Sequence, residues 1–293
     1  MEGLIIKAIS GFYYVETADK TVIECKARGK FKNISQSLLV GDRVNITLSG
    51  ENGVVDAVLP RKNILNRPPV ANIDKLFIVS SSVVPSPNAL LIDRMTALCV
   101  YKNIDPVIVF NKTDLEDVSP WCEIYRGAGL KTIACSAKTG EGIEEIIAEL
   151  KGNISAFTGN SGAGKSSLLN KIFPTLNLST GDVSSKLGRG RHTTRHTELF
   201  PHSFEGYVAD TPGFSSLEAD KDDLEFKENL CNFFPDFDEF KFDCRFSDCN
   251  HIGEKGCAVF EAVKAGKIQP SRYKSYKTIF EELKDINAWN IKK

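Results

Sequence analysis

The first 66 residues consist of short apolar stretches separated by polar turns. Five of these stretches alternate between apolar and polar positions, which is the pattern of a strand with one buried face: GLIIKAI, FYYVET, KTVIECKA, DRVNITL and GVVDAVL. Gly, Asn and Asp residues stand between them, as at residues 49–53. Five short strands in so few residues favour a small closed barrel over a sandwich.

A different pattern begins after residues 67–69, Arg-Pro-Pro. Apolar runs alternate here with helical stretches, which indicates a parallel sheet whose two faces are both covered by helices. We expect strands at 75–82, 106–110, 132–136 and 154–158, and helices at 90–101 and 141–150. The alternation ends near Leu217.

The last part of the chain starts with an acidic, aromatic and cysteine-bearing stretch, DFDEFKFDCRFSDCNH, and closes with a lysine-rich helical segment. A chain of 293 residues has room for two or three domains that each bury a core. The changes of pattern predict a multidomain protein with a β-barrel over 1–66, an α/β domain over 67–220 and a third domain over 221–293.

Residues 159–166, GNSGAGKS, match the phosphate-binding loop pattern G-x-x-x-x-G-K-[ST]. An apolar strand leads into this loop and the helical sequence SSLLNKIF leads out of it. Glycines let backbone N–H groups turn toward phosphate oxygens at a helix N-terminus. We expect Lys165 to contact the β- and γ-phosphates and the Ser166 hydroxyl to bind Mg²⁺. The expected nucleotide-binding residues of the loop are Gly159, Asn160, Ser161, Gly162, Ala163, Gly164, Lys165, Ser166 and Ser167.

The sequence NKTD at residues 111–114 follows an apolar strand and matches the guanine-reading pattern N-K-x-D. The Asp114 carboxylate can accept both the N1–H and the 2-amino group of guanine, whereas adenine would leave it unpaired. We expect Asn111 to hold this segment to the phosphate-binding loop. We expect the Lys112 side chain to cover one face of the base.

Ser136, Ala137 and Lys138 strengthen this interpretation, since they follow the next strand and can offer a backbone N–H to the guanine O6. Together with the phosphate-binding loop, the two guanine elements favour GTP over ATP. Both come before that loop in the chain, whereas most GTPases begin with it. The order of the motifs therefore predicts a circularly permuted GTPase domain, whose original termini are joined and whose new termini are opened elsewhere.

The sequence DTPG at residues 210–213 matches D-x-x-G. We expect Asp210 to hold Mg²⁺ through water and the Gly213 N–H to sense the γ-phosphate. A basic, glycine-rich segment at 187–196 lies between this motif and the phosphate-binding loop. One of its two threonines should complete the Mg²⁺ shell, and we favour Thr194 over the preceding one.

Phe214 stands where many GTPases carry a glutamine that orients the attacking water. Phenylalanine cannot orient water, so we predict slow intrinsic hydrolysis and help from a partner or from another part of the chain. His192 and His196 are candidates, and His192 is preferred because it adjoins the threonines; a histidine that contacts only RNA or solvent is equally compatible. His192 and Lys165 are our candidate catalytic residues.

Cys244, Cys249, His251 and Cys257 bring three thiols and an imidazole into one short window. This donor set suits a closed, tetrahedral, structural Zn²⁺ site. The spacings are not those of a common zinc finger, and free cysteines in a small helical core are the alternative. The chain has eight cysteines, too few at this length for a disulfide scaffold.

The composition is that of an ordinary globular protein, with 42% hydrophobic and 26% charged residues. No stretch approaches the roughly 18 apolar residues of a membrane span, and the N-terminus lacks a signal-peptide pattern. We therefore expect a cytoplasmic protein with no membrane contact. The net charge of −1 gives no overall attraction to nucleic acid, so RNA contacts must come from local basic clusters. The candidates, each equally compatible with solvated surface charge, are Lys26, Arg28, Lys30, Lys32, Arg61, Lys62, Arg67, Arg189, Arg191 and Arg195.

With the barrel in front and the cysteine segment behind, the whole chain resembles the RsgA family, also called YjeQ or YloQ. The segments GNSGAGKSSL, GRGRHTTR, DTPGF and CxxxxCxHxxxxxC carry the resemblance. It implies an OB-fold barrel that binds RNA, a permuted P-loop GTPase domain, and a mostly α-helical domain with one structural Zn²⁺. It also implies Mg²⁺-dependent GTP hydrolysis during late maturation of the small ribosomal subunit, stimulated by that subunit and its rRNA. We expect the free protein to be a monomer.

Other functions are compatible with parts of the sequence. A permuted GTPase of the large subunit is disfavoured by the barrel and the cysteine cluster, and a P-loop kinase or ATPase would leave Asp114 idle. A nucleotide-gated RNA-binding module with incidental hydrolysis finds its best support in Phe214. Since DTPG runs almost directly into the cysteine-bearing domain, we also expect the γ-phosphate to shift that domain relative to the GTPase domain.

Overall fold

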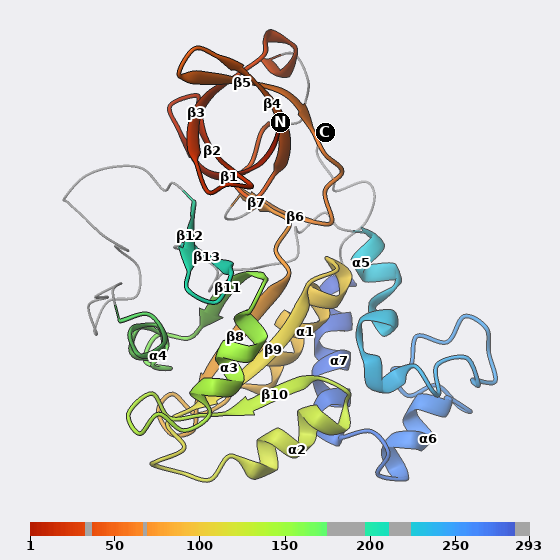
Figure 1. Cartoon of the computed structure of the whole chain (residues 1–293). Coiled ribbons are helices and arrows are strands. Elements are labelled where there is room, and N and C mark those ends of the chain that lie inside the picture. Colours follow the sequence, from red (N-terminus) through yellow and green to blue (C-terminus); the bar gives the residue numbers. More distant parts are fainter. Residues whose placement is uncertain (33–36, 67–68, 175–196, 211–223, 285–293) are drawn as a thin grey trace.

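The computed structural model describes residues 1–32, 37–66, 69–174, 197–210 and 224–284, with the backbone only at Lys30, Lys32, Asp210 and Leu224. A barrel lies at one end of the molecule, an α/β sheet in the middle, and the C-terminal helices along one side of the sheet (Figure 1). Among the described residues, no helix combines the length and the apolar character needed to cross a bilayer.

The barrel contains the five strands that the sequence predicts. They are β1 (Glu2–Ile9), β2 (Phe12–Thr17), β3 (Val22–Ala27), β4 (Arg43–Ser49) and β5 (Asn52–Val58), with the short 3₁₀ helix η1 (Gly29–Lys32) after β3. The strand order is β1-β2-β3-β5-β4, and β4 pairs back with β1 to close the barrel. This is the five-stranded Greek-key barrel of the OB-fold. Alternate side chains fill its interior, including Ile5, Val15, Val44 and Val55, all fully buried.

A two-stranded hairpin lies between the barrel and the central sheet. It pairs β6 (Ile64–Asn66) with β7 (Pro69–Ala71) and forms a sheet of its own. The sequence pattern did not reveal it, because strands of three residues are too short to show alternation. The domain boundary drawn between residues 66 and 67 falls inside this hairpin.

The central sheet is parallel, as predicted, in the order β10-β9-β8-β11-β13. Its strands are β8 (Lys75–Ser81), β9 (Asp105–Asn111), β10 (Lys131–Ala134), β11 (Ile154–Gly159) and β13 (Gly206–Asp210), with the antiparallel β12 (Glu198–His202) beside β13. The helices between them are α1 (Ala89–Tyr101), α2 (Ser119–Gly127), α3 (Ile143–Leu150) and α4 (Lys165–Ile172). The carboxyl ends of the parallel strands meet at one edge, which is where parallel sheets place their ligands.

Helices cover both faces of this sheet. Along β9, Ile108 and Phe110 join the hydrophobic cluster that contains α1, whereas Val107 and Val109 join the one that contains α3 and α4. This alternation follows from the period of two in a strand. The helix predicted from residue 141 begins only at Ile143, because Gly142 before it has φ +71°, which is outside the helical range. A Cβ at this position would collide with the Ala134 carbonyl, so the position requires glycine.

The barrel and the sheet are joined through β12. Lys7 of β1 pairs in register with Glu198 of β12, and the Lys7 Nζ lies 3.0 Å from a Glu198 carboxylate oxygen. Tyr207 of β13 donates its hydroxyl hydrogen bond to the buried Glu16 of β2, and Lys20 Nζ lies 3.0 Å from the same carboxylate. One eleven-stranded sheet therefore runs from the barrel into the α/β part.

The C-terminal part is mostly helical and has its own aromatic core. It comprises α5 (Leu224–Glu228), η4 (Leu230–Phe233), η5 (Pro235–Phe237), α6 (Ala258–Lys264) and α7 (Pro270–Leu283). Phe234, Phe237 and Tyr276 are fully buried, and their rings lie 4.9–5.4 Å apart. Helix α7 lies along α1 of the sheet part, as Figure 1 shows.

Candidate nucleotide and metal sites

The phosphate-binding loop connects β11 to α4 at the carboxyl edge of the sheet. Gly162 and Gly164 have φ of +83° and +86°, conformations that glycine adopts without strain. A Cβ at Gly164 would collide with the Asn111 side-chain nitrogen. The last glycine is thus required both by its backbone angle and by the close approach of the guanine-reading segment.

Asn111 makes the contact to the phosphate-binding loop that the sequence predicts. Its buried side chain donates from Nδ2 to the Ala163 carbonyl at 3.1 Å. Its Oδ1 accepts from the Ala137 N–H, also at 3.1 Å. One amide therefore joins the loops that follow β9, β10 and β11.

Lys112 forms a second connection between the same two motifs. Its Nζ donates to the Gly162 carbonyl at 2.7 Å and to the Val84 carbonyl at 2.9 Å. The residue adopts φ +71°, which turns the chain sharply after β9. The guanine-reading and phosphate-binding motifs therefore lie on the same side of the sheet and are hydrogen-bonded to each other, despite their reversed order in the sequence.

Contacts with two residues of the next loop orient the Asp114 carboxylate and keep it ionised, so that it can accept hydrogen bonds. Ser136 Oγ donates to its Oδ1 at 2.7 Å, and Lys138 Nζ lies 3.5 Å from its Oδ2. The hydrogen bond from Ser136 lowers the pKa of Asp114, with a smaller contribution from Lys138. An ionised carboxylate accepts hydrogen bonds only, as the N1–H and 2-amino group of guanine require.

Two residues that support this edge carry no motif and were missed in the sequence. Ser82, directly after β8, donates from Oγ to the Lys112 carbonyl at 2.8 Å and from its N–H to the Asn111 carbonyl at 2.9 Å. Glu141 accepts from Thr113 Oγ1 at 3.1 Å, and its carbonyl accepts from the Ser136 N–H at 3.0 Å. The only available signal was that both follow strands ending at this edge.

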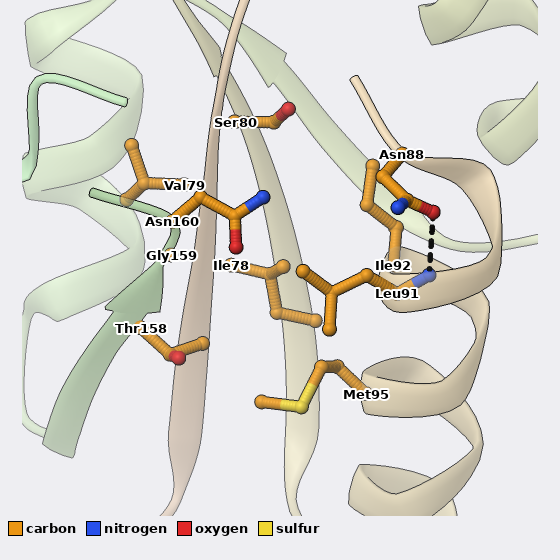
Figure 2. A pocket seen from close by; sticks show the side chains of 10 residues that line it. All are labelled: Ile78, Val79, Ser80, Asn88, Leu91, Ile92, Met95, Thr158, Gly159 and Asn160. Atoms are coloured by element: carbon orange, nitrogen blue, oxygen red, sulfur yellow. Dashed lines mark hydrogen bonds between the residues drawn. The ribbon is translucent and has the colours of Figure 1, made fainter. Parts of the chain in front are cut away.

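A small cavity lies behind the phosphate-binding loop, between β8, β11 and α1 (Figure 2). Asn160 extends its amide toward α1, and Asn88 accepts a hydrogen bond from the Leu91 N–H at the start of that helix. The cavity volume is about 20 Å³, room for a single water molecule. It is too small for a nucleotide.

The residues expected around Mg²⁺ and the γ-phosphate are described only in part. Lys165 and Ser166 begin α4, with Ser166 buried, and Asp210 ends β13 beside β11. The Asp210 side chain lies outside the described atoms. Thr194, His192 and Gly213 lie outside the described residues.

The four proposed zinc ligands come together in space. One ligand atom from each of Cys244, Cys249, His251 and Cys257 lies within 4.8 Å of all the others. The His251 Nδ1 is 3.4 Å from the Cys244 sulfur and 3.7 Å from the Cys257 sulfur. Such spacings match the edges of a tetrahedron around zinc, with bonds of about 2.3 Å to sulfur and 2.0 Å to nitrogen.

The surroundings of this cluster favour a metal-binding state. Burial lowers the pKa of His251, which keeps its imidazole neutral and able to bind metal. The Ala258 N–H donates to the Cys244 sulfur and the Phe260 N–H to the Cys257 sulfur, at 3.3 and 3.4 Å. Such donors stabilise thiolates, but burial outweighs them and raises the pKa of the Cys257 thiol in the absence of metal. The donor set therefore fits a structural Zn²⁺ ion.

Comparison with known proteins agrees with this arrangement. The family model of the RsgA GTPase matches residues 58–220, and that of the RsgA N-terminal domain matches residues 2–55. The chain belongs to the RsgA GTPase family. This confirms the resemblance drawn from its motifs, and makes the chain a P-loop GTPase.

The relatives match over nearly the full length of the chain. The small ribosomal subunit biogenesis GTPase RsgA of Caldanaerobacter subterraneus subsp. tengcongensis is 47% identical over 289 residues, 97% of this chain and 96% of that protein. The protein of the same name from Geobacillus thermodenitrificans is 46% identical over 291 residues, 97% and 98% of the two chains.

Two solved structures of the family share the fold. YjeQ from Thermotoga maritima is 39% identical, with a TM-score of 0.84 over 97% of this chain and 98% of that one. YloQ, described as a circularly permuted GTPase, is 37% identical, with a TM-score of 0.81 over 98% and 96% of the two chains. The motif order of this chain has the same permutation.

Proposed function

We propose that this chain hydrolyses GTP to GDP and phosphate on the small ribosomal subunit, late in the maturation of that subunit, and that the subunit stimulates hydrolysis. The small-subunit part of the proposal rests on the relatives named small ribosomal subunit biogenesis GTPase. The observation that carries the GTP-binding part is the pair of connections from Asn111 and Lys112 to the phosphate-binding loop. They bring the guanine-reading and phosphate-reading groups within reach of one nucleotide. We infer that the protein works in the cytoplasm, as a monomer when free and without membrane contact.

The guanine base is read by groups from two loops. Asp114 accepts the N1–H and the 2-amino hydrogen, and a backbone N–H of the segment Ser136, Ala137 and Lys138 donates to O6. The stem of Lys112 covers one face of the base. Support comes from the ionised state of Asp114 and from the hydrogen bond that fixes its orientation.

The phosphates and Mg²⁺ are held at the start of α4. Backbone N–H groups of Gly159 to Ser167 and the Lys165 ammonium bind the phosphate oxygens. The Ser166 hydroxyl, Thr194 and Asp210 hold Mg²⁺, which neutralises charge on the phosphates when bound. The Gly213 N–H senses the γ-phosphate.

Hydrolysis in the free protein is slow, because Phe214 cannot position water. We propose that His192 takes that role when the protein is bound to the small subunit. In the third domain, Cys244, Cys249, His251 and Cys257 hold one structural Zn²⁺.

The test is GTP turnover by the purified protein alone, with small subunits and with large subunits. We expect small subunits to raise turnover by at least about tenfold and large subunits to leave it unchanged. Stimulation by large subunits instead would show that the protein acts on the large ribosomal subunit. Tight small-subunit binding with no stimulation would favour a nucleotide-gated RNA-binding module.

A further inference from the structure

Two aromatic rings stand exposed on one loop of the third domain. Residues 238–249, which we call the acidic aromatic loop, belong to the segment between η5 and α6 that projects from the side of the molecule in Figure 1. Phe242 is 84% exposed and Phe246 is 48% exposed. They lie two residues before and two residues after Cys244. Neither ring belongs to the aromatic core of the domain, so both are available to a partner.

The loop holds the rings on a rigid support. The Arg245 N–H donates to the Gly256 carbonyl at 2.9 Å, and the Cys249 N–H donates to the Phe246 carbonyl. Glu254 accepts from the N–H groups of Asn250 and Ile252 at 2.9 and 2.8 Å. Groups fixed before binding lose little conformational entropy when a partner docks. Exposed aromatic side chains on such a support are typical anchors of protein interfaces.

Each ring already accepts a cation from its own chain. The Lys241 Nζ lies 5.2 Å from the centre of the Phe242 ring, and the Arg245 guanidinium lies 5.5 Å from that of Phe246. Lys241 is also paired with Asp238 at 2.7 Å. The large exposed fraction of both rings leaves apolar surface that a partner side chain can cover.

The charge of the loop selects between partners. It carries four acidic residues and two basic ones. Within the described part of the chain, the exposed carboxylates of Glu239, Asp243 and Asp248 form no ion pair. Carboxylates repel the phosphates of RNA and attract Lys and Arg. An arginine side chain can stack on a ring and form a paired hydrogen bond to a carboxylate at the same time.

We propose that Phe242, Phe246 and the carboxylates Glu239, Asp243 and Asp248 form a docking surface for an arginine- and lysine-rich polypeptide segment. The rings supply the apolar and cation-binding area, and the carboxylates supply the charge that excludes RNA. The surface is separate from the nucleotide site and does not depend on the proposed GTPase cycle.

The experiment titrates the full-length, zinc-loaded protein into a fluorescein-labelled nine-residue peptide of alternating Arg and Gly, and separately into a nine-residue oligouridine. We expect the peptide to bind and the Phe242→Ala/Phe246→Ala variant to weaken binding by about tenfold. Asp243→Lys weakens it similarly, and added salt weakens it further. Two controls on the barrel, Leu48→Ala at a residue 49% exposed and Glu51→Lys, leave binding unchanged.

Two outcomes overturn the proposal. One is peptide binding by the double phenylalanine variant with the affinity of the natural protein. The other is oligouridine binding that depends on the two rings, which would make the loop an RNA-stacking site instead. Zinc content and urea unfolding of each variant confirm that it is folded. Asp243→Lys, a change at an exposed position, keeps the test decisive if removal of the rings disturbs the loop.

Discussion

At the scale of single residues, Asn111 shows how one buried amide can define a site. Its donor and its acceptor are satisfied by backbone groups of two different loops, at Ala163 and Ala137. Both loops lie far from Asn111 in the sequence. Side-chain hydrogen bonds thus hold the site together in addition to the sheet. These hydrogen bonds can form whatever the order of the strands in the sequence.

Replacement of Asn111 by alanine should therefore lower stability as well as nucleotide affinity. The change leaves the buried Ala163 carbonyl and the half-buried Ala137 N–H without their partner, at a cost of roughly 2–4 kcal/mol in the free energy of unfolding. Urea unfolding without nucleotide measures this loss. Asn232→Ala, at an exposed asparagine, is the control and should stay within about 0.5 kcal/mol. A matching result for the two variants would show that Asn111 does not hold the loops together.

His192 is the residue whose role is least constrained. We predict that His192→Ala lowers small-subunit-stimulated GTP turnover by on the order of 100-fold while GTP affinity stays unchanged. His196→Ala, four residues away in the same segment, should retain most of the activity. Single-turnover kinetics with saturating subunits separate the two. Equal activity of His192→Ala and the natural protein would remove His192 from the mechanism.

The motifs predicted the residues that contact Asn111 because each motif follows a strand, and the carboxyl ends of parallel strands meet at one edge. Ser82 and Glu141 could not be found in this way. Ser82 bonds to the backbone of the guanine-reading motif, and Glu141 bonds to the Thr113 side chain and to the Ser136 backbone. A serine or glutamate after a strand is common without such a role. Their contacts with the motif residues can be seen only when the paired strands of the sheet are known.

At the scale of elements, the contact between α1 and α7 includes a buried charge cluster. Arg272 of α7 donates to Asp93 of α1 at 2.7 Å and forms two bonds to Asp236 of η5, at 2.7 and 2.8 Å. All three side chains are almost fully buried. The sequence did not reveal this cluster, since the three residues are distant in the chain and each is of a type usually found on the surface.

Removal of Arg272 should cost more at high pH than at low pH. Arg272→Ala leaves two buried carboxylates unpaired, which lowers the free energy of unfolding by about 3–5 kcal/mol. Burial already raises the pKa of Asp93 to about 6, against the opposing effect of Arg272, and the loss of the guanidinium raises it further. The folded variant therefore binds protons more readily than the unfolded chain, so its stability falls as pH rises through this range.

Urea unfolding at pH 5 and pH 8 measures this difference. Arg94→Ala is a matched control, because Arg94 also connects α1 to α7, through a half-exposed pair with Glu282. That pair should contribute less than about 1 kcal/mol at either pH. A loss from Arg272→Ala that is equal at both pH values would contradict the assignment of buried, ionised carboxylates.

The zinc cluster gives a second prediction at this scale. Burial raises the pKa of the Cys249 thiol to about 12 in the absence of metal, so the thiol must lose its proton when zinc binds. The apparent zinc affinity should therefore rise with pH, about tenfold per pH unit for each proton released. Competition with a chromophoric chelator between pH 6 and pH 8 measures this slope. Cys231→Ser, at a cysteine outside the cluster, should leave the slope unchanged, whereas Cys249→Ser should reduce it.

The sequence predicted the elements whose apolar residues form a clear repeating pattern or a continuous run. All five barrel strands and the parallel strands β8, β9 and β11 are six or more residues long, whereas the parallel strands β10 and β13 are shorter and each leads into a motif. Helix α2 was missed because it buries only Cys122 and Tyr125, too few to mark a face. Strand β12 was missed because it continues a segment, 187–196, that reads as a basic loop.

At the scale of the whole molecule, the barrel is continuous with the hairpin β12–β13. That hairpin ends at Asp210, where the DTPG motif begins. The predicted domain boundaries near residues 66 and 220 came from changes of sequence pattern, which do not register contacts between domains such as Lys7 with Glu198. These boundaries stay predictions.

The expected shift of the third domain with the γ-phosphate also stays a prediction. The Arg272 cluster limits how the third domain can move, because sliding α7 along α1 would break buried, charged hydrogen bonds. A displacement must therefore carry α1 with it. The same position of α7 relative to the central sheet in GTP-analogue and GDP structures would count against the shift.

The most direct test measures whether one site binds both the guanine base and the phosphates of the same nucleotide. Competition against a fluorescent GDP analogue gives the affinities for GTP, ATP and xanthosine triphosphate, in the natural protein and in Asp114→Asn. Xanthine carries a carbonyl where guanine carries the 2-amino group, and an asparagine amide can donate to it. Asp117→Asn, close by in the same segment, is the control.

We predict that the natural protein binds GTP and rejects ATP. Asp114→Asn should lose GTP affinity by on the order of 100-fold or more and gain affinity for xanthosine triphosphate. Asp117→Asn should behave like the natural protein. If ATP competes as well as GTP, or if Asp114→Asn leaves the preference for GTP intact, the two motifs do not share a nucleotide and the central claim fails.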